Sequence, residues 1–326
     1  MLGNETTASH LEVVGYDEKD RAFVVKSSSG HVLKISDTFA EMFPMWCGRV
    51  LITADSEKWA LTAAATATGL GTSVIMSPAE AGIEGTVSGG ETPDGRAGAL
   101  VQVYNRSRFD LKAQMILRIG QCVMTCPTTA AFDAMRNAKR RLKVGRSLRL
   151  FGDGFQRKGI VADRKVWKIP VMEGDFVVED TFGVAEAVAG GNFLILARDK
   201  LAGLKAAEEA VKAIKARASD VILPFPGGIC RSGSKVGSLK YKLKASTNHI
   251  YCPRLRAVVS DSQVPEGVSS VYEIVVNGLT VDAVKKAMAE GLKAAAAVDG
   301  VERISAGNYG GKIGPYKAYL KEILGN

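Results

Sequence analysis

The chain of 326 residues is long enough to bury a sizeable core, so one large or two medium domains are expected. Hydrophobic residues make up 46% and charged residues 24%, which is typical of a soluble globular protein. The net charge of +9 is spread along the chain, and the short basic runs at 139–149 and 240–244 lack the aromatic spacing of a stacking platform. No nucleic-acid partner is therefore predicted.

The N-terminus, the apolar stretches and the cysteines indicate a cytoplasmic protein. MLGNETTASH lacks the charged start and apolar core of a signal peptide, and TGLGTS interrupts the uncharged stretch 59–79, so no membrane anchor is predicted. The five cysteines form no CxxC pair and are expected to be reduced. With three histidines, two of them near the N-terminus, no metal centre is predicted. A Ser-His-Asp or Cys-His apparatus would have to use His249, which lies close to Cys252.

Residues 1–35 are predicted to form an N-terminal extension that contains a hairpin. The strand-like runs LEVVGY and RAFVVK flank the turn-like DEKD, and a third run, HVLKI, follows SSSG. The body of the protein then begins near SDTFAEMF.

The first lobe is predicted over residues 36–170. A strand VLITA precedes the helical SEKWALTAAATA and the strand TSVIMSPAEAGIE, and a second unit follows with ALVQVY, the helical DLKAQMILRI and the strand QCVMTCP. Short strands in KVWKIPV and DFVVED lie near the boundary with the next lobe.

The second lobe, predicted over residues 171–326, repeats this order. Its first unit is NFLILA, the helical AGLKAAEEAVKAIKA and DVILPFPGGICR, and its second is VYEIVVNG, the helical TVDAVKKAMAEGLKAAAAV and VERISAGNYGG. A β-α-β–β-α-β order that occurs twice predicts an α+β fold with two duplicated ferredoxin-like lobes, whose antiparallel sheets are flanked by helices. The alternative is that two unrelated α/β halves share a general likeness.

Polar, glycine-rich loops follow several of these strands. PFPGGICRSGSKVGS lacks the Lys-Ser/Thr pair of a phosphate loop, and no GxGxxG opens a helix after a strand, so no nucleotide motif is present. The loops AEAG, FGDG, GICRSGSK, ASTN and AGNYGGK could still hold carboxylates, amides or phosphates through backbone N–H groups and small hydroxyls. Each of them could instead be a simple tight turn.

Long runs of the sequence resemble the formylmethanofuran:tetrahydromethanopterin formyltransferase family, from SDTFAEMF to the C-terminus. The matching runs include TGLGTSVIMSPAEAGI, ETPDGR, RIGQCVMTCPTTAAFDA, FGDGFQ, RKVWKIPVMEGDFVVED, PFPGGICRSGSKVGS, ASTNHIYCP, VYEIVVNGL and SAGNYGGKIG. Residues 1–35 are mostly extra relative to the family pattern, Ala97 replaces a usual proline, and Arg254 replaces a smaller residue. The candidate substrate-binding residues lie in these runs and are Gln121, Asp153, Arg231, Ser232, Ser234, Lys235, Asn248 and Asn308.

The resemblance implies a homotetramer, built as a dimer of dimers, with a cleft near a subunit interface. It implies formyl transfer between the amine of methanofuran and a ring nitrogen of tetrahydromethanopterin, which act as co-substrates, with no metal and no covalently bound cofactor. In methanogens this reaction belongs to methanogenesis, and in methylotrophic bacteria a similar subunit works with formylhydrolase subunits in one complex. The alternative is a non-catalytic, pterin-binding or scaffold subunit of such a complex.

Glu273 is the predicted catalytic acid. It is the only charged residue in VYEIVVNG, whose two faces both look buried, so the carboxyl is expected to be neutral. An attacking amine needs no serine or cysteine relay, but the tetrahedral oxyanion must be stabilised and the departing amine protonated. A neutral acid can do either, and the resemblance also points to the glutamate of YEIV. The alternative is that Glu273 pairs with a buried arginine or lysine and has a structural role.

Overall fold

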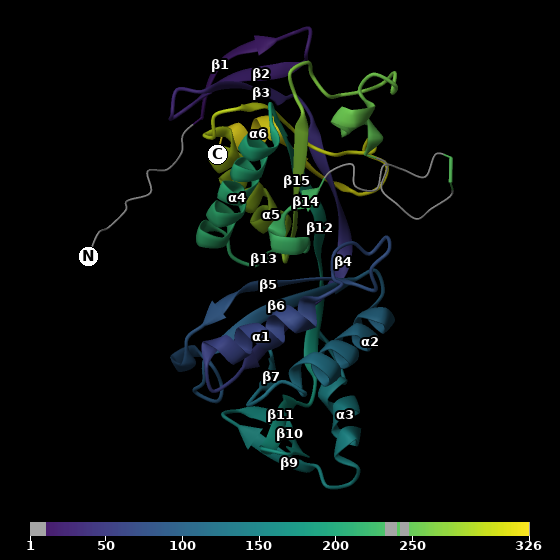
Figure 1. Cartoon of the computed structure of the whole chain (residues 1–326). Helices are drawn as coiled ribbons and strands as arrows, with labels where there is room; N and C mark the ends of the chain where they lie inside the picture. Colours follow the sequence, from purple (N-terminus) through teal and green to yellow (C-terminus); the bar gives the residue numbers. More distant parts are fainter. Residues whose placement is uncertain (1–10, 232–239, 242–247, 326) are drawn as a thin grey trace, which may run out of the picture. The chain divides into compact units, whose positions relative to one another are not determined.

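The computed structural model of the chain describes residues 11–231, 240–241 and 248–325 (Figure 1). Internal contacts divide the chain into two compact units. Unit 1 comprises residues 1–43, 189–221 and 226–326, and unit 2 comprises residues 44–188 and 222–225. Three strands, β4 (Phe39–Thr53), β12 (Phe182–Ala197) and β13 (Val221–Ile222), contribute residues to both units.

Unit 1 contains the beginning and the end of the chain. Its other elements are β1 (Leu11–Asp17), β2 (Ala22–Ser27), β3 (Val32–Ser36), α4 (Lys200–Arg217), η4 (Pro226–Gly228), β14 (Cys230–Arg231), η5 (His249–Tyr251), η6 (Pro253–Leu255), β15 (Ser270–Gly278), α5 (Val281–Ala296), β16 (Val301–Ser305), β17 (Tyr316–Tyr319) and α6 (Leu320–Leu324).

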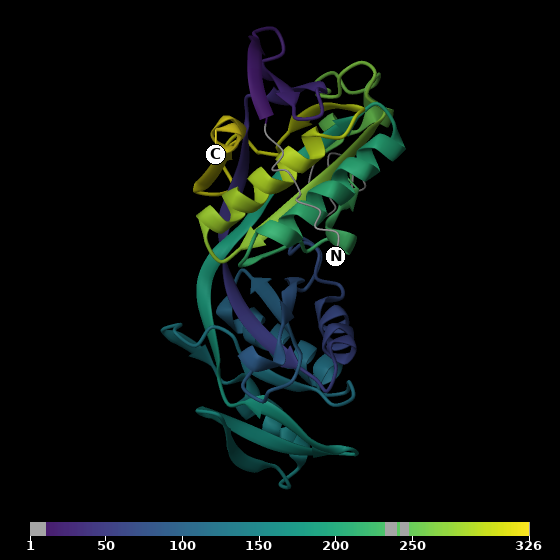
Figure 2. The same ribbon diagram turned by 90° about the vertical axis from the view of Figure 1, so that its left-hand side faces the viewer.

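The strands of unit 1 have the order expected of a ferredoxin-like lobe. β12 lies between β16 and β15, and β15 pairs on its other side with β13 and β14. Helices α4 and α5 lie side by side on one face of these strands (Figure 2). Each helix begins at a capped residue, because Asp199 accepts hydrogen bonds from the N–H groups of Leu201 and Ala202 and Thr280 accepts one from Ala283. One apolar stripe of α5 is buried, and it contains Val284, Met288, Leu292 and Ala295.

The N-terminal strands extend the sheet of unit 1. β1 and β2 form an antiparallel hairpin, β2 pairs with β3, and β3 pairs in parallel with β16. Asp20, in the turn of the hairpin, accepts hydrogen bonds from Lys34 of β3 and Arg303 of β16. The hairpin is therefore held to unit 1 by charged side chains as well as by backbone pairing.

Unit 2 contains the middle of the chain. Its elements, besides its parts of β4, β12 and β13, are α1 (Glu57–Thr68), β5 (Glu80–Val87), η1 (Gly89–Glu91), β6 (Gly98–Asn105), α2 (Arg108–Arg118), the π-helical turn η2 (Ile119–Val123), β7 (Ala130–Asp133), β8 (Arg140–Leu142), α3 (Val144–Leu148), η3 (Arg149–Gly152), β9 (Arg157–Val161), β10 (Arg164–Val171) and β11 (Gly174–Glu179).

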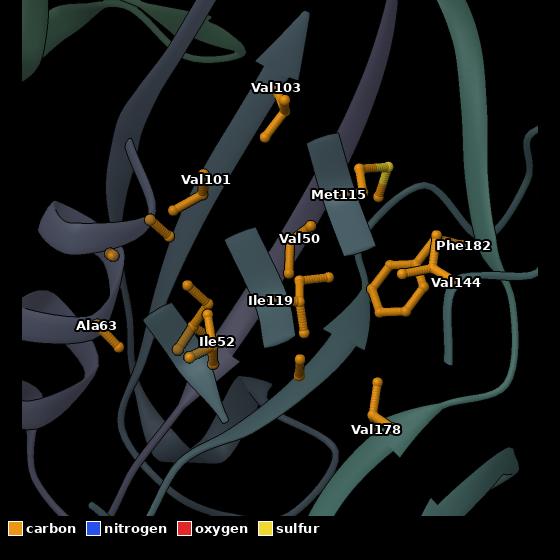
Figure 3. Packing of buried hydrophobic residues seen from close by; sticks show 14 of the residues in the cluster. Val50, Ile52, Ala63, Val101, Val103, Met115, Ile119, Val144, Val178 and Phe182 are labelled. Atoms are coloured by element: carbon orange, nitrogen blue, oxygen red, sulfur yellow. The ribbon is translucent and has the colours of Figure 1, made fainter. Parts of the chain in front are cut away.

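Unit 2 repeats the strand order of unit 1. β4 lies between β7 and β6, and β5 pairs with the other edge of β6, all of them antiparallel. Helices α1 and α2 cover one face, where side chains such as Val50, Ile119 and Phe182 form a fully apolar core (Figure 3). On the opposite face Leu51 packs with Phe132. The same order in both units confirms the predicted α+β fold with two ferredoxin-like lobes.

Two predicted strands of this unit are wrong in their positions. The run QCVMTCP is not a strand, because α2 continues into the π-helical turn, where the N–H of Met124 donates to the carbonyl of Ile119, and the strand comes later as β7. The strand predicted in TSVIMSPAEAGIE begins only at Glu80. Residues 73–77 turn instead, with the N–H groups of Met76 and Ser77 bonded to Ser73.

The compact units also differ in extent from the boundaries that we expected at 35/36 and 170/171. The chain passes from unit 1 to unit 2 between residues 43 and 44, inside the long strand β4. It returns to unit 1 between residues 188 and 189, inside the long strand β12. The N-terminal hairpin groups with the C-terminal part of the chain. Since both boundaries fall inside long strands, no irregular linker segment separates the two units at these positions.

Candidate active site

Glu273 lies in the middle of β15, on the face that points away from helices α4 and α5. Its neighbour Tyr272 points toward the helices, because a Cβ added at Gly203 of α4 would lie 2.9 Å from the Tyr272 ring. Side chains alternate along a strand, so Glu273 shares the other face with Val271. There Val271 packs in an apolar cluster against which Tyr251 also lies.

We expected both faces of this strand to be buried, and the structure corrects this for one of them. Ile274 and Val276, on the helix side, have no accessible surface, although Tyr272 on that side is partly exposed. On the other side Glu273 and Val275 keep part of their surface exposed, whereas Val271 and Asn277 are buried.

The carboxyl of Glu273 is held close to neutrality. Burial raises its pKa from 4.5 to about 7, while a hydrogen bond from the Cys230 thiol acts in the opposite direction. Cys230 stands directly opposite Glu273 in the pairing of β14 with β15. Within the described residues no arginine or lysine forms an ion pair with Glu273, so the structural alternative finds no partner there. At neutral pH the group can therefore both donate a proton and accept one.

The charge of Glu273 acts on the pKa values of two tyrosine phenols. Burial raises the pKa of Tyr251, and the charge of Glu273 adds to the rise. Burial also raises the pKa of Tyr309, again with a contribution from Glu273. Both phenols are therefore protonated at neutral pH and can donate hydrogen bonds. Tyr309 is 42% exposed, so part of its ring is open to a ligand.

Three of the predicted substrate-binding residues lie in unit 1 and are described by the structure. Arg231 follows Cys230 on β14, opposite Tyr272, and its side chain is exposed. Asn248 immediately precedes η5 and is partly exposed. The amide nitrogen of Asn308 donates to Thr38 Oγ1 at 2.9 Å and to the carbonyl of Phe39 at 3.2 Å, so this side chain already has partners within the protein.

The remaining candidates lie elsewhere. Ser232, Ser234 and Lys235 lie outside the described residues. Gln121 and Asp153 belong to unit 2, where both are exposed. They belong to neighbouring segments, since a Cβ at Gly120 would lie 3.9 Å from the ring of Phe151. Asp153 itself has a left-handed backbone, with φ of 47°.

Sequence reasoning missed three side chains around the acid, which are Cys230, Tyr251 and Tyr309. Each lies one to three residues from a predicted binding residue, in the runs GGICRS, NHIYCP and GNYGG. A tyrosine inside a polar or glycine-rich loop was the available signal, because an aromatic ring with a polar tip is unusual in a simple tight turn.

The described residues contain no group of three His, Cys, Asp or Glu side chains that could hold a metal ion. All five cysteines are free, and burial raises the pKa of Cys47 to about 12, so this thiol is inert. His249 faces Asp261 at 3.9 Å. No helix within the described ranges is long and apolar enough to cross a membrane.

Comparison with known proteins places both parts of the chain in one family. Residues 30–171 match the family described as formylmethanofuran-tetrahydromethanopterin formyltransferase, and residues 174–323 match the family described as its proximal lobe. The enzyme of this name from Methanocaldococcus jannaschii is 54% identical over 294 residues, which cover 89% of this chain and 97% of the relative. The enzyme from Methanopyrus kandleri is 54% identical over 296 residues, covering 90% and 98%.

Solved structures agree with the sequence comparison. The formyltransferase from Methanosarcina barkeri is 49% identical, with a TM-score of 0.85 over 90% of this chain and 99% of that one. A chain of the formyltransferase/hydrolase complex from Methylorubrum extorquens, solved with methylofuran, is 42% identical, with a TM-score of 0.85 over 91% of this chain and 97% of that one. These matches confirm the resemblance seen in the sequence.

Proposed function

Because the chain belongs to the formylmethanofuran–tetrahydromethanopterin formyltransferase family, and is thus an N-formyltransferase of one-carbon metabolism, we propose that Glu273 is its catalytic acid. The observation that carries this proposal is the pKa of about 7 on a buried strand carboxyl that has no basic partner among the described residues. Perturbed pKa values of this kind are common at catalytic sites.

The reaction is a direct transfer between two amines. The nitrogen of one co-substrate attacks the formyl carbon of the other, a tetrahedral intermediate forms, and the bond to the leaving nitrogen breaks. Neutral Glu273 donates a hydrogen bond to the developing oxyanion, or it gives its proton to the leaving amine. No cysteine is required as a nucleophile, which agrees with the high pKa of Cys47 and the partial burial of the other thiols.

The two co-substrates, methanofuran and tetrahydromethanopterin or close variants, bind around this carboxyl. Arg231, Ser232, Ser234 and Lys235 hold anionic ligand tails through charge and hydroxyl contacts. Asn248, Asn308, Gln121 and Asp153 provide further polar contacts. Arg231 is exposed on the strand that pairs with the strand of Glu273, which supports this assignment. For Ser232, Ser234 and Lys235 the assignment rests on the sequence alone.

The protein works in the cytoplasm as a homotetramer built as a dimer of dimers. This assignment rests on the family resemblance. A second form is an assembly with formylhydrolase subunits, which the similarity to a chain of the Methylorubrum extorquens complex favours. The non-catalytic alternative is tested by mixing the purified chain with both co-substrates, because only an enzyme transfers the formyl group unaided.

Substitution of Glu273 tests its role. Glu273→Gln keeps the shape and an N–H donor but cannot transfer a proton, whereas Glu273→Ala removes both. If the side chain only donates a hydrogen bond, kcat of the Ala variant should fall roughly 10²–10³-fold and the Gln variant should keep much of the rate. If it transfers a proton, both variants should lose about 10²–10⁴-fold.

Glu302→Gln is the matched control. Glu302 is exposed on β16, so its variant should turn over like the parent. Parent-like turnover of both Glu273 variants, with folding intact, would show that Glu273 is structural.

A further inference from the structure

Cys230 and Glu273 occupy directly opposite positions on two paired strands. The register of β14 with β15 joins Cys230 to Glu273 and Arg231 to Tyr272. Side chains of directly opposed residues extend on the same face of a sheet, with their Cβ atoms about 4.5–5.5 Å apart. The Cys230 thiol is therefore within reach of the Glu273 carboxyl, to which it donates a hydrogen bond.

A turn with two consecutive glycines precedes Cys230 and fixes where β14 begins. Gly227 and Gly228 both have left-handed backbones, with φ of 64° and 86°, which a residue without a Cβ adopts at no steric cost. The N–H of Ile229 donates to the carbonyl of Pro226 at 3.2 Å and closes the turn. A shift of the strand by one residue would turn the Cys230 side chain to the other face of the sheet. The turn therefore places a thiol, rather than a larger side chain, beside the acid.

The thiol acts on Glu273 in the direction opposite to burial. Burial raises the pKa of Glu273 to about 7, and the hydrogen bond from Cys230 limits this rise, because a donor stabilises the charged carboxylate. Cys230 forms no disulfide within the described part of the chain, so its thiol proton is retained for this contact. Loss of the thiol should therefore raise the pKa of Glu273 further.

A neutral carboxyl has one oxygen that carries the proton and one that only accepts hydrogen bonds. No arginine or lysine among the described residues forms an ion pair with Glu273, so no charged partner distinguishes its two oxygens. A thiol that donates to one oxygen makes that oxygen the acceptor, and the proton then stays on the other. A group that acts on a transition state must be held in one orientation by its neighbours, and Cys230 is the neighbour that can do this for Glu273.

We propose that Cys230 is the positioning residue of the Glu273 site: its thiol donates to one carboxyl oxygen and keeps the proton of the neutral acid on the oxygen that faces the formyl group or the leaving amine. The proposal rests on the assignment of Glu273 as the catalytic acid. The thiol forms no bond to the formyl carbon, so the direct transfer between two amines is retained. Its effect on turnover is exerted through Glu273 alone.

Substitutions of Cys230 separate this role from a structural one. Cys230→Ala and Cys230→Val both remove the donor, and valine fills a space of similar size, whereas Cys230→Ser keeps a donor. Cys126→Ala is the matched control, because Cys126 in unit 2 is also a partly exposed thiol but donates to the carbonyl of Trp59 at 3.8 Å. Cys230→Ala is also combined with Glu273→Gln.

The ionisation of Glu273 is measured on the full-length proteins, both directly and through the reaction. The NMR signal of its carboxyl carbon, in protein labelled with carbon-13 at the glutamate carboxyl groups, gives the pKa without catalysis, and Glu273→Gln identifies this signal by lacking it. The pH dependence of kcat/KM between about pH 5 and pH 9 reports the same ionisation in the free enzyme. Glu273 also acts on the phenols of Tyr251 and Tyr309, whose raised pKa values keep both protonated over this range.

Cys230→Ala and Cys230→Val should raise the pKa of Glu273 by roughly 0.5–1 pH unit, the size expected for one hydrogen bond. The alkaline limb of kcat/KM should move to higher pH by the same amount, and kcat below this limb should fall about 2–10-fold. Cys230→Ser should stay close to the parent in all three values. In the Glu273→Gln background Cys230→Ala should change kcat little further, and Cys126→Ala should change none of these values.

Three results would overturn the proposal. An unchanged carboxyl pKa in a folded Cys230→Ala or Cys230→Val variant excludes the hydrogen bond and leaves the role of Glu273 as it was. Losses of kcat that multiply in the double variant exclude the action of Cys230 through Glu273. A raised carboxyl pKa with an unmoved limb of kcat/KM shows that Glu273 is not the acid of the transfer, and the proposed function then fails together with the positioning role.

Discussion

Burial opposes the ionisation of Glu273, and glutamine cannot ionise. The free energy of unfolding of Glu273→Gln should therefore depend on pH less than that of the parent does. The pKa of Glu273 is about 7 in the folded chain and 4.5 in the reference state. The folded state therefore binds the proton more tightly than the unfolded state does. The resulting contribution to stability is fully present below pH 4.5 and is lost as the pH rises through 7.

The size of this loss of stability follows from the shift in the pKa of Glu273. At 1.36 kcal/mol per pKa unit, a rise from 4.5 to about 7 corresponds to about 3 kcal/mol over the whole range. Most of it, about 2 to 3 kcal/mol, is lost between about pH 5 and pH 8. Glutamine does not titrate, so the free energy of unfolding of Glu273→Gln, relative to the parent, should rise by this amount across the same interval.

Urea unfolding of both proteins at several pH values between 5 and 8, at one ionic strength and one protein concentration, measures the difference. Glu302→Gln serves as the control, because the exposed Glu302 should give a curve parallel to that of the parent. Parallel curves for Glu273→Gln and the parent would refute the raised pKa. The neutral acid would then lose its physical basis.

Two further predictions concern the packing of each unit. Phe182→Ala should lower the free energy of unfolding by about 3–5 kcal/mol, because the ring is fully buried in the core of unit 2 (Figure 3) and its removal leaves a cavity; an effect below about 1 kcal/mol in urea unfolding would contradict this. Asp20→Asn should cost about 1–3 kcal/mol, because Lys34 and the mostly buried Arg303 lose a shared carboxylate, whereas Glu18→Gln at an exposed position of the same turn should stay within about 0.5 kcal/mol in the same assay.

Much of the fold could be predicted because local pattern and tertiary packing agree. The stripe of α5 that includes Val284 and Met288 is the face that packs on the sheet, and the repeated order of strands and helices gives the duplicated lobe directly. QCVMTCP misled because the π-helical turn at 119–123 is apolar, and an apolar run of this length fits a strand equally well.

The candidate site could be predicted only in part, for a physical reason. Glu273 was detectable because a lone carboxylate in an apolar strand conflicts with its local pattern. The contact of Cys230 with Glu273 depends on the pairing of β14 with β15, and nothing in the local sequence of either strand indicates this register.

The duplicated fold provides an internal comparison for the acid. In unit 2 the strand β6 corresponds to β15, and Gln102 and Tyr104 occupy its face away from the helices, both without accessible surface. There the carboxylate of Glu84 is bonded to Arg49 and accepts the amide of Gln102, which in turn accepts the Tyr104 hydroxyl. The Glu84 carboxylate is thus paired with an arginine. Glu273 sits on the corresponding face of unit 1, where it accepts a hydrogen bond from the Cys230 thiol and has no basic partner among the described residues. Since the same architecture pairs an acid with an arginine in unit 2, the fold does not itself require Glu273 to lack a basic partner among the described residues, and this contrast supports its proposed role as the catalytic acid.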